Sequence, residues 1–123
     1  MTITLDMFKD AKDLETFDIG EIIFEQGDPG DFMYVVVEGE EEVILREKVI
    51  TKLAPGEFLD EMALIDNRPR RASARASART KLAPVNRFSF TYYVQNSPFF
   101  ALDVMEIMAE RLRVQMEKDN YAN

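Results

Sequence analysis

The residues best suited to chemistry lie in one arginine-rich stretch, NRPRRASARASART, from Asn67 to Thr80. Between Arg68 and Lys81 there are six cations and no acidic residue, whereas residues 15–66 hold 15 acids and three cations, a net charge of −12. The whole chain carries a net charge of −8. Guanidinium groups gathered in so acidic a chain suit one of three tasks: a basic arm for nucleic acid, a kinase substrate sequence, or the lining of a pocket for a small anion.

Strict alternation inside this stretch predicts a β-strand. From residue 71 to residue 79 arginine or serine alternates with alanine, and a period of two gives a strand one inward face. Alanine and arginine also favour helix, which is the competing prediction. We favour the strand because Pro69 and Pro84 bound the stretch at strand length. A solvated arm does not need alternation, and a serine held in a folded strand, such as Ser73, is a poor kinase substrate.

A second feature suited to anions precedes the arginines. The run DEMALI favours a short helix, and RPR follows it two residues later. A helix start presents unpaired N–H groups, and an arginine that faces it offers a planar pair of donors, so one phosphate fits between them. Many loops place an arginine near a helix, so this signal is weak when taken alone.

The composition argues against several classes of function. The chain has neither cysteine nor histidine, so it lacks thiolates, imidazole bases and the commonest metal ligands. We therefore expect no enzyme, no metal site and no redox cofactor. The net charge of −8 argues against nucleic acid as a partner. No apolar run approaches the roughly 20 residues that span a bilayer, so we expect a cytoplasmic protein without a membrane partner.

Three segments of a single domain must position these groups. Residues 1–16 mix short apolar and charged groups and predict a helical lead-in. Residues 17–97 bring a turn signal about every eight to twelve residues, with β-branched runs between the turns, which predicts short antiparallel strands in a sandwich or small barrel. A short helix is expected at 88–95, before the C-terminal segment 98–123.

The C-terminal segment predicts an amphipathic helix over residues 98–116. Ser97 followed by Pro98 is a typical helix start. Apolar residues then recur every three or four positions, at Leu102, Met105, Ala109, Leu112 and Met116. Such a stripe fits equally well against the domain's own sheet or in a parallel helix seam. We expect a homodimer through this helix, with burial in its own domain as the alternative.

The order of the motifs resembles the cyclic-nucleotide-binding domain family. GEIIFEQGDPGDFMYVVVEGE is followed by LAPGEF and then by EMALIDNRPR, and the likeness extends over residues 17–114. The family includes catabolite-activator-type regulators, regulatory subunits of cAMP-dependent protein kinase and cyclic-nucleotide-gated channels. The resemblance implies a mainly β fold with flanking α-helices: an antiparallel β jelly-roll barrel, a short helix in a phosphate-binding cassette, and C-terminal helices. It also implies cAMP or cGMP as the ligand.

The same resemblance implies a role for each site residue. Glu61 stands where a carboxylate accepts the ribose 2′-hydroxyl, and Arg70 where an arginine pairs with the cyclic phosphate. Ala72, and Met62 at the start of the short helix, would offer backbone N–H groups. The apolar side chains that would flank the base are Val43 and Leu53.

The chain departs from the family's pattern at several charged positions. Leu59, Asp60 and Glu61 stand where F-G-E is usual, so Asp60 puts a carboxylate beside the phosphate. At about 5 Å and an effective dielectric near 20, that charge is worth roughly 3 kcal/mol, which would weaken binding on the order of a hundredfold. Arg71 stands at a serine or threonine position and could offset much of this effect. Glu41 replaces an apolar residue, and strand alternation points it inward.

Two functions remain open on these residues. The first is a ligand-sensing module that binds cAMP or cGMP through Arg70 and Glu61. The second is a ligand-independent interaction or dimerisation module, whose pocket is plugged because Glu41, Asp60 and Arg71 pair with one another. A local alternative is that Glu41 turns outward at a bulge while the other two reach solvent. The sequence does not decide between the two nucleotides.

Overall fold

The computed structural model describes residues 3, 5–8, 11–66 and 68–122, and their strands form two antiparallel sheets. One sheet has the order β1-β8-β3-β6 and the other the order β2-β7-β4-β5. The strands are β1 (Glu15–Phe17), β2 (Ile22–Phe24), β3 (Met33–Glu38), β4 (Glu41–Leu45), β5 (Lys48–Leu53), β6 (Phe58–Leu59), β7 (Ser73–Ala76) and β8 (Thr80–Val85). This is the strand order of a double-sheet jelly roll.

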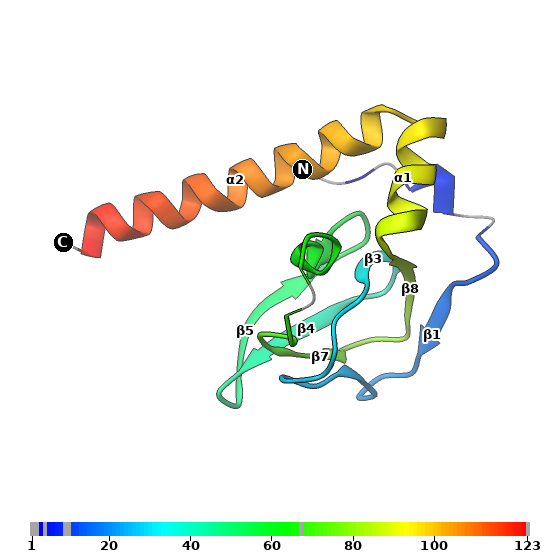
Figure 1. The fold of residues 1–123 in the computed structure, drawn as a ribbon. Helices are drawn as coiled ribbons and strands as arrows, with labels where there is room; N and C mark the ends of the chain where they lie inside the picture. Colours follow the sequence, from blue (N-terminus) through cyan, green and yellow to red (C-terminus); the bar gives the residue numbers. More distant parts are fainter. Residues whose placement is uncertain (1–2, 4, 9–10, 67, 123) are drawn as a thin grey trace.

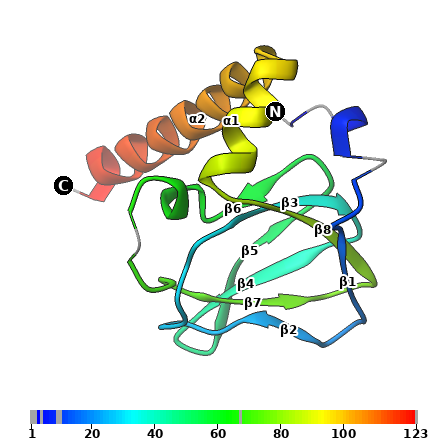
Figure 2. The same ribbon diagram turned by 45° about the vertical axis from the view of Figure 1, so that its right-hand side comes forward.

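The architecture is therefore mainly β with helices at one side, as expected, but the hydrogen-bonded strands of the described residues do not close into one barrel. The helical elements are η1 (Asp6–Phe8), η2 (Glu61–Leu64), α1 (Arg87–Asn96) and α2 (Phe99–Ala122). In both ribbon views α1 and α2 lie on the same side of the strands, and the C-terminal part of α2 extends past them (Figures 1 and 2). Among its described residues the lead-in has one 3-10 turn, η1, and β1 begins inside the expected 1–16 segment.

The alternating stretch is a strand, as its period of two predicts. Ala74 and Ala76 of β7 are buried, while Arg75 points to the other face and pairs with Glu42 of β4 at 2.7 Å. The strand covers residues 73–76 of the expected 71–79. It lies between β2 and β4, where small alanine side chains allow the facing sheet to pack closely.

The core has two layers because β3 buries both of its faces. Met33 and Val35 point toward the helices and pack with Phe8, Phe58 and Phe100. The alternate residues of β3 point between the two sheets, where the buried apolar cluster consists of Val36, Val43, Leu53 and Leu82. The helices are thus attached through one sheet only, and the space between the sheets is filled separately.

Helix α2 packs through a different stripe from the one expected. Its buried residues are Phe100, Val104 and Ile107. The expected stripe faces outward instead, with its larger members between 54 and 62% exposed: Leu102, Met105, Leu112 and Met116. Burial of that stripe in the domain's own core is therefore wrong. Both stripes have helical spacing, and the aromatic ring of Phe100, packed among Phe8, Phe90 and Tyr93, selects the inward one.

Two glycines with the same backbone conformation allow a matched test of packing. Gly39 and Gly20 have φ of 89° and 88°. A Cβ at Gly39 would lie 2.6 Å from Oγ1 of Thr80 and closer still to the Arg79 carbonyl oxygen, whereas a Cβ at Gly20 would meet nothing within 4 Å.

We expect Gly39→Ala to lower the free energy of unfolding by about 3 kcal/mol, because strain and overpacking add. Gly20→Ala should cost about 1 kcal/mol, from backbone strain alone. Urea denaturation measures both. Equal effects of the two substitutions would show that the contact with residues 79 and 80 carries no energy.

Candidate functional site

The segment that holds most of the predicted site residues folds around one cavity of about 230 Å³. It contributes the end of β6, the turn η2 and the residues just before β7, while β2 and α2 complete the wall. The lining residues are Phe24, Leu59, Asp60, Glu61, Met62, Arg71, Ala72 and Arg111. Six of the nine predicted site residues are thus brought together, and Arg70 lies directly behind them through its contact with Asp60.

Asp60 has a backbone conformation that explains the direction of its side chain. Its φ of 71° and ψ of 36° lie in the left-handed region, just before η2. Aspartate tolerates this region better than most residues, and the family has glycine at this position. From there its Oδ2 atom accepts a hydrogen bond from Nη1 of Arg70, forming an ion pair with that side chain.

Arg70 is 4% exposed, and its Nε atom has no hydrogen-bond partner among the described residues. Nη1 also donates to the carbonyl oxygen of Phe32 at 2.6 Å. The guanidinium carbon lies 4.5 Å from the ring centroid of Phe24 and 5.4 Å from that of Tyr34, within the range of cation–π attraction. The residue predicted to pair with a phosphate is therefore already paired with a carboxylate, and it does not line the cavity.

The turn between β2 and β3 fixes the backbone of Arg70. Its N–H donates to the Asp28 carbonyl oxygen, and its carbonyl oxygen accepts from the N–H of Gly27, both at 2.9 Å. A Cβ at Gly30 would lie 3.2 Å from Cδ and Nε of Arg70, so the glycine leaves room for the arginine side chain. The QGDPGD motif thus acts as a support for the arginine.

Glu61 is paired with a residue that the sequence analysis missed. Its Oε2 atom lies 3.4 Å from Nη1 of Arg111, in helix α2. Nη2 of Arg111 donates to the Phe58 carbonyl oxygen at 2.6 Å, and the guanidinium lies over the Phe58 ring at 4.6 Å. The signal was the position of Arg111 four residues after Ile107, which puts it on the face of α2 that packs against the domain.

Arg71 differs from its neighbour in both exposure and pairing. It is exposed, it lines the cavity, and within the part of the chain that the structure describes it makes no hydrogen bond or ion pair. Its five N–H donors are therefore free toward the cavity or solvent.

Glu41 points inward from β4, as strand alternation predicts, and is fully buried. Neither carboxylate oxygen has a hydrogen-bond partner among the described residues. Burial raises the pKa of Glu41 from 4.5 to about 7. Burial also raises the pKa of the Tyr34 phenol, and Glu41 is one of the carboxylates that add to that shift. The side chain belongs to the region between the sheets and does not line the cavity.

The three unusual charges therefore do not pair with one another, and that hypothesis is wrong. Asp60 pairs with Arg70, Arg71 stays free, and Glu41 lies in the core because the register of β4 places it opposite Leu53 and Ala76. The local alternative, with Glu41 turned outward, is wrong as well. Val43 and Leu53, expected beside the base, are 3 and 5% exposed in the core between the sheets and do not line the cavity.

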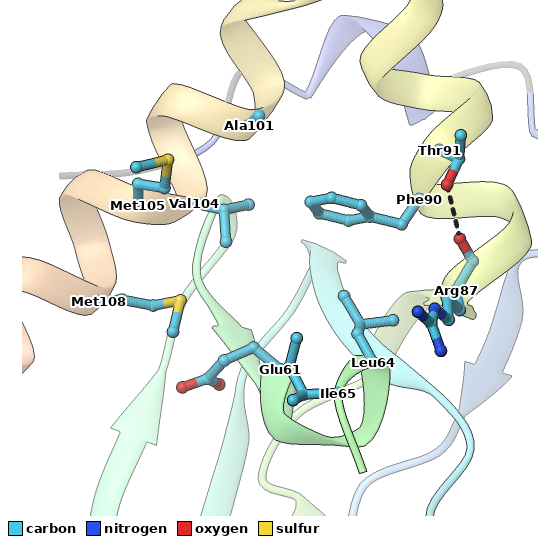
Figure 3. Close-up of a pocket in the computed structure, with 10 residues that line it drawn as sticks. All are labelled: Glu61, Leu64, Ile65, Arg87, Phe90, Thr91, Ala101, Val104, Met105 and Met108. Carbon is cyan, nitrogen blue, oxygen red and sulfur yellow. Dashed lines mark hydrogen bonds between the residues drawn. The ribbon is translucent and has the colours of Figure 1, made fainter.

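A second, more apolar cavity of about 370 Å³ separates η2 from α1 and α2. Figure 3 shows Leu64, Phe90 and Val104 pointing into it from three different elements. Glu61 lines this cavity as well as the first one. Leu64 of η2 also belongs to the buried cluster that contains Val104, and the Glu61–Arg111 pair is a polar link between η2 and α2.

A jelly roll whose cassette segment encloses a charged cavity defines a module for binding a small ligand. The chain matches the family model of the cyclic nucleotide-binding domain over residues 14–97. It therefore belongs to the cyclic nucleotide-binding domain family. Among the described residues no group of three or more acidic side chains could hold a metal ion, and no helix is long and apolar enough to cross a membrane.

Relatives with known roles agree with this assignment. The chain is 39% identical, over 83 residues, to a cAMP-dependent protein kinase regulatory subunit of Emericella nidulans, covering 66% of this chain and 20% of that protein. It is 33% identical, over 99 residues, to the cyclic AMP receptor protein of Thermus thermophilus, covering 76% of this chain and 46% of that protein.

A solved structure shows the same fold. The catabolite activator protein of Thermus thermophilus superposes with a TM-score of 0.74 and 30% identity, covering 89% of this chain and 54% of that one. The chain thus spans between 20 and 54% of the length of these three proteins.

The raised pKa of Glu41 predicts that stability depends on pH. Between pH 4.5 and about 7 the unfolded chain releases the proton of Glu41 while the folded chain keeps it. We expect the free energy of unfolding to fall by roughly 3 kcal/mol as the pH rises through this window, and then to level off.

Glu41→Gln should remove this slope, because the amide does not titrate. Its strand neighbour Glu42, which points to the other face, is the control, and Glu42→Gln should keep the slope. Urea denaturation at a series of pH values measures both variants. Burial also raises the pKa of Glu15, which leaves a residual slope, so an undiminished slope in Glu41→Gln would contradict the burial of an ionisable Glu41 in the core.

Proposed function

We propose that this domain is a regulatory module that binds a cyclic mononucleotide, cAMP or cGMP, in the cavity between β6, η2 and β7. One observation carries the proposal: Asp60, Glu61, Met62, Arg71 and Ala72 line a single cavity beside a buried arginine. The carboxylate of Glu61 accepts the ribose 2′-hydroxyl. The cyclic phosphate lies at the arginine pair Arg70–Arg71 and near the backbone N–H groups of residues 62 and 72. The role is regulatory rather than enzymatic.

In this proposal the ligand competes for groups that already have partners. A ribose hydroxyl at Glu61 shares the carboxylate with Arg111, which is fixed to α2. The binding of the ligand therefore changes the polar link between η2 and the helices, beside a cavity into which apolar side chains can move. Through this contact, ligand binding would change how α2 packs and how it meets any partner of that helix.

We also propose that α2 forms a homodimer seam. Four large apolar residues of one helical stripe are exposed, and of these Met105 also lines the cavity between η2 and the helices. Together with Ala109 these four recur every three or four residues, which suits knobs-into-holes packing against a second copy of the same helix. Dimerisation in this proposal accompanies ligand binding and does not replace it.

Titration calorimetry with cAMP and cGMP tests the binding function. We expect a saturable heat of binding with at least one of the two nucleotides. Glu61→Gln should bind with an affinity lower by on the order of 10- to 100-fold, since a hydrogen bond to a charged group is weakened. Glu25→Gln, an exposed acid outside the cavity, should bind as the wild type does. Removal of the 2′-hydroxyl from the ligand should lower the affinity of the wild type more than it lowers the affinity of Glu61→Gln. Absence of heat with both nucleotides at millimolar concentration would contradict the proposal.

Light scattering after size exclusion tests the helix seam. The wild type should show twice the chain mass of 14.2 kDa, and Leu112→Glu should show that mass once, because a carboxylate inside an apolar seam is unfavourable. Gln115→Glu adds the same charge to α2 outside the stripe and should leave the dimer intact. A monomeric wild type at high concentration would exclude the seam.

A further inference from the structure

We propose that the apolar cavity of about 370 Å³ between η2, α1 and α2 is a second ligand site, which takes a carboxylic acid with an apolar tail. This site is separate from the one assigned to the cyclic nucleotide, because among the described residues Glu61 alone lines both cavities. The inference therefore does not rest on the proposed binding of a nucleotide.

The cavity is lined by apolar side chains from three elements. Leu64 of η2, Phe90 of α1 and Val104 of α2 point into it (Figure 3). Its volume lies within the range of about 300 to 1,000 Å³ that is usual for small-molecule sites. Protein interiors are otherwise close-packed, and a wall that faces an empty apolar space forfeits dispersion contacts. An apolar group that leaves water for this cavity regains those contacts.

Apolar side chains also surround the opening of the cavity to solvent. Ile65 of η2 is 74% exposed, and Met105 and Met108 of α2 are 62 and 37% exposed. Methionine side chains are flexible and adapt to the shape of a bound group. A tail that passes through this opening can therefore also cover apolar surface that is otherwise in contact with water.

The cavity wall carries one charged group without a partner, and that group is a cation. Arg87, at the start of α1, is exposed, and among the described residues its guanidinium forms neither an ion pair nor a hydrogen bond. The other charged residue of the lining, Glu61, is paired with Arg111. The hydroxyl of Thr91 donates to the carbonyl oxygen of Arg87 at 3.1 Å. The wall thus offers one free positive charge beside an apolar space.

This combination determines the class of ligand. The planar guanidinium of Arg87 can donate two parallel hydrogen bonds to a carboxylate. An aliphatic tail fills the space between η2 and the helices, and each buried methylene raises the affinity about fourfold. A neutral amphiphile would gain nothing from Arg87, and a small acid without a tail would gain nothing from the apolar wall. A monocarboxylic acid with an aliphatic tail uses both.

Titration calorimetry with sodium octanoate tests the site. The wild type should bind one octanoate per chain. Hexanoate, which is two methylenes shorter, should bind about 15-fold more weakly. Octanamide keeps the tail but lacks the charge, so it should bind about tenfold more weakly than octanoate.

Three variants separate the contribution of the charge from that of the tail. Arg87→Gln should bind octanoate about tenfold more weakly, and it should no longer distinguish octanoate from octanamide. Arg79→Gln removes another exposed arginine that lies outside the cavity, and it should bind as the wild type does. Ala101→Leu puts a larger side chain on the cavity wall, so it should weaken the binding of octanoate and octanamide by a similar factor.

Methyl NMR of the methionines shows where the octanoate lies. Addition of octanoate should shift the methyl signals of Met105 and Met108, which line the cavity. Met33 of β3 is fully buried in the core outside the cavity, so its methyl signal should stay where it is.

The outcomes decide between this ligand and another occupant of the cavity. Equal affinity of the wild type for octanoate and octanamide would overturn the role of Arg87. Absence of octanoate binding at millimolar concentration, or shifts that spare both Met105 and Met108, would overturn the site itself. If octanoate does not bind and Ala101→Leu changes the mass measured by light scattering, a second copy of the chain covers the cavity instead. A failure to bind cAMP and cGMP would contradict the proposed function and leave this site standing.

Discussion

The ion pair between Asp60 and Arg70 is the interaction on which the site depends. A guanidinium that is 4% exposed requires a counter-ion, and the only carboxylate that it contacts in the described structure is Asp60. The pair joins the start of η2 to Arg70, which lies just before strand β7. The turn at residues 27–28 holds the backbone of the same arginine. With Arg70 fixed in this way, the next residue, Arg71, is left exposed at the cavity.

The second ion pair extends this arrangement to the C-terminal helix. Glu61 is adjacent to Asp60 in the chain, yet it pairs with Arg111 of α2 and not with Arg70. Two neighbouring carboxylates thus connect η2 to two separate parts of the molecule. The turn η2 borders an apolar cavity of about 370 Å³, and its Leu64 packs in the same buried cluster as Val104 of α2. Through Glu61 and Arg111, α2 is therefore tied to one wall of the cavity of about 230 Å³.

The periodicity of the sequence predicted the strands and helices well, but it could not predict which charged residues pair with one another. Alternation identified the strand around Ala74 and Ala76 and turned Glu41 inward, since both follow from the pleat of a strand. It could not show that Asp60 would meet Arg70 and not Arg71, because that depends on a left-handed backbone at residue 60. In α2 two apolar stripes share helical spacing, and only the tertiary packing of Phe100 distinguishes them.

Carboxylates that are paired in the free domain contribute differently to the free energy of ligand binding than carboxylates that are unpaired there. Desolvation of Asp60 and Glu61 is already compensated by Arg70 and Arg111, so these two carboxylates are not left unpaired for a ligand to neutralise. The favourable free energy of binding then comes from new contacts between the ligand and groups that have no partner in the free domain. A ligand shifts a conformational equilibrium only by its differential affinity for the two states. Under the proposed function, the Asp60–Arg70 and Glu61–Arg111 pairs oppose ligand binding, because the ligand competes for the same groups.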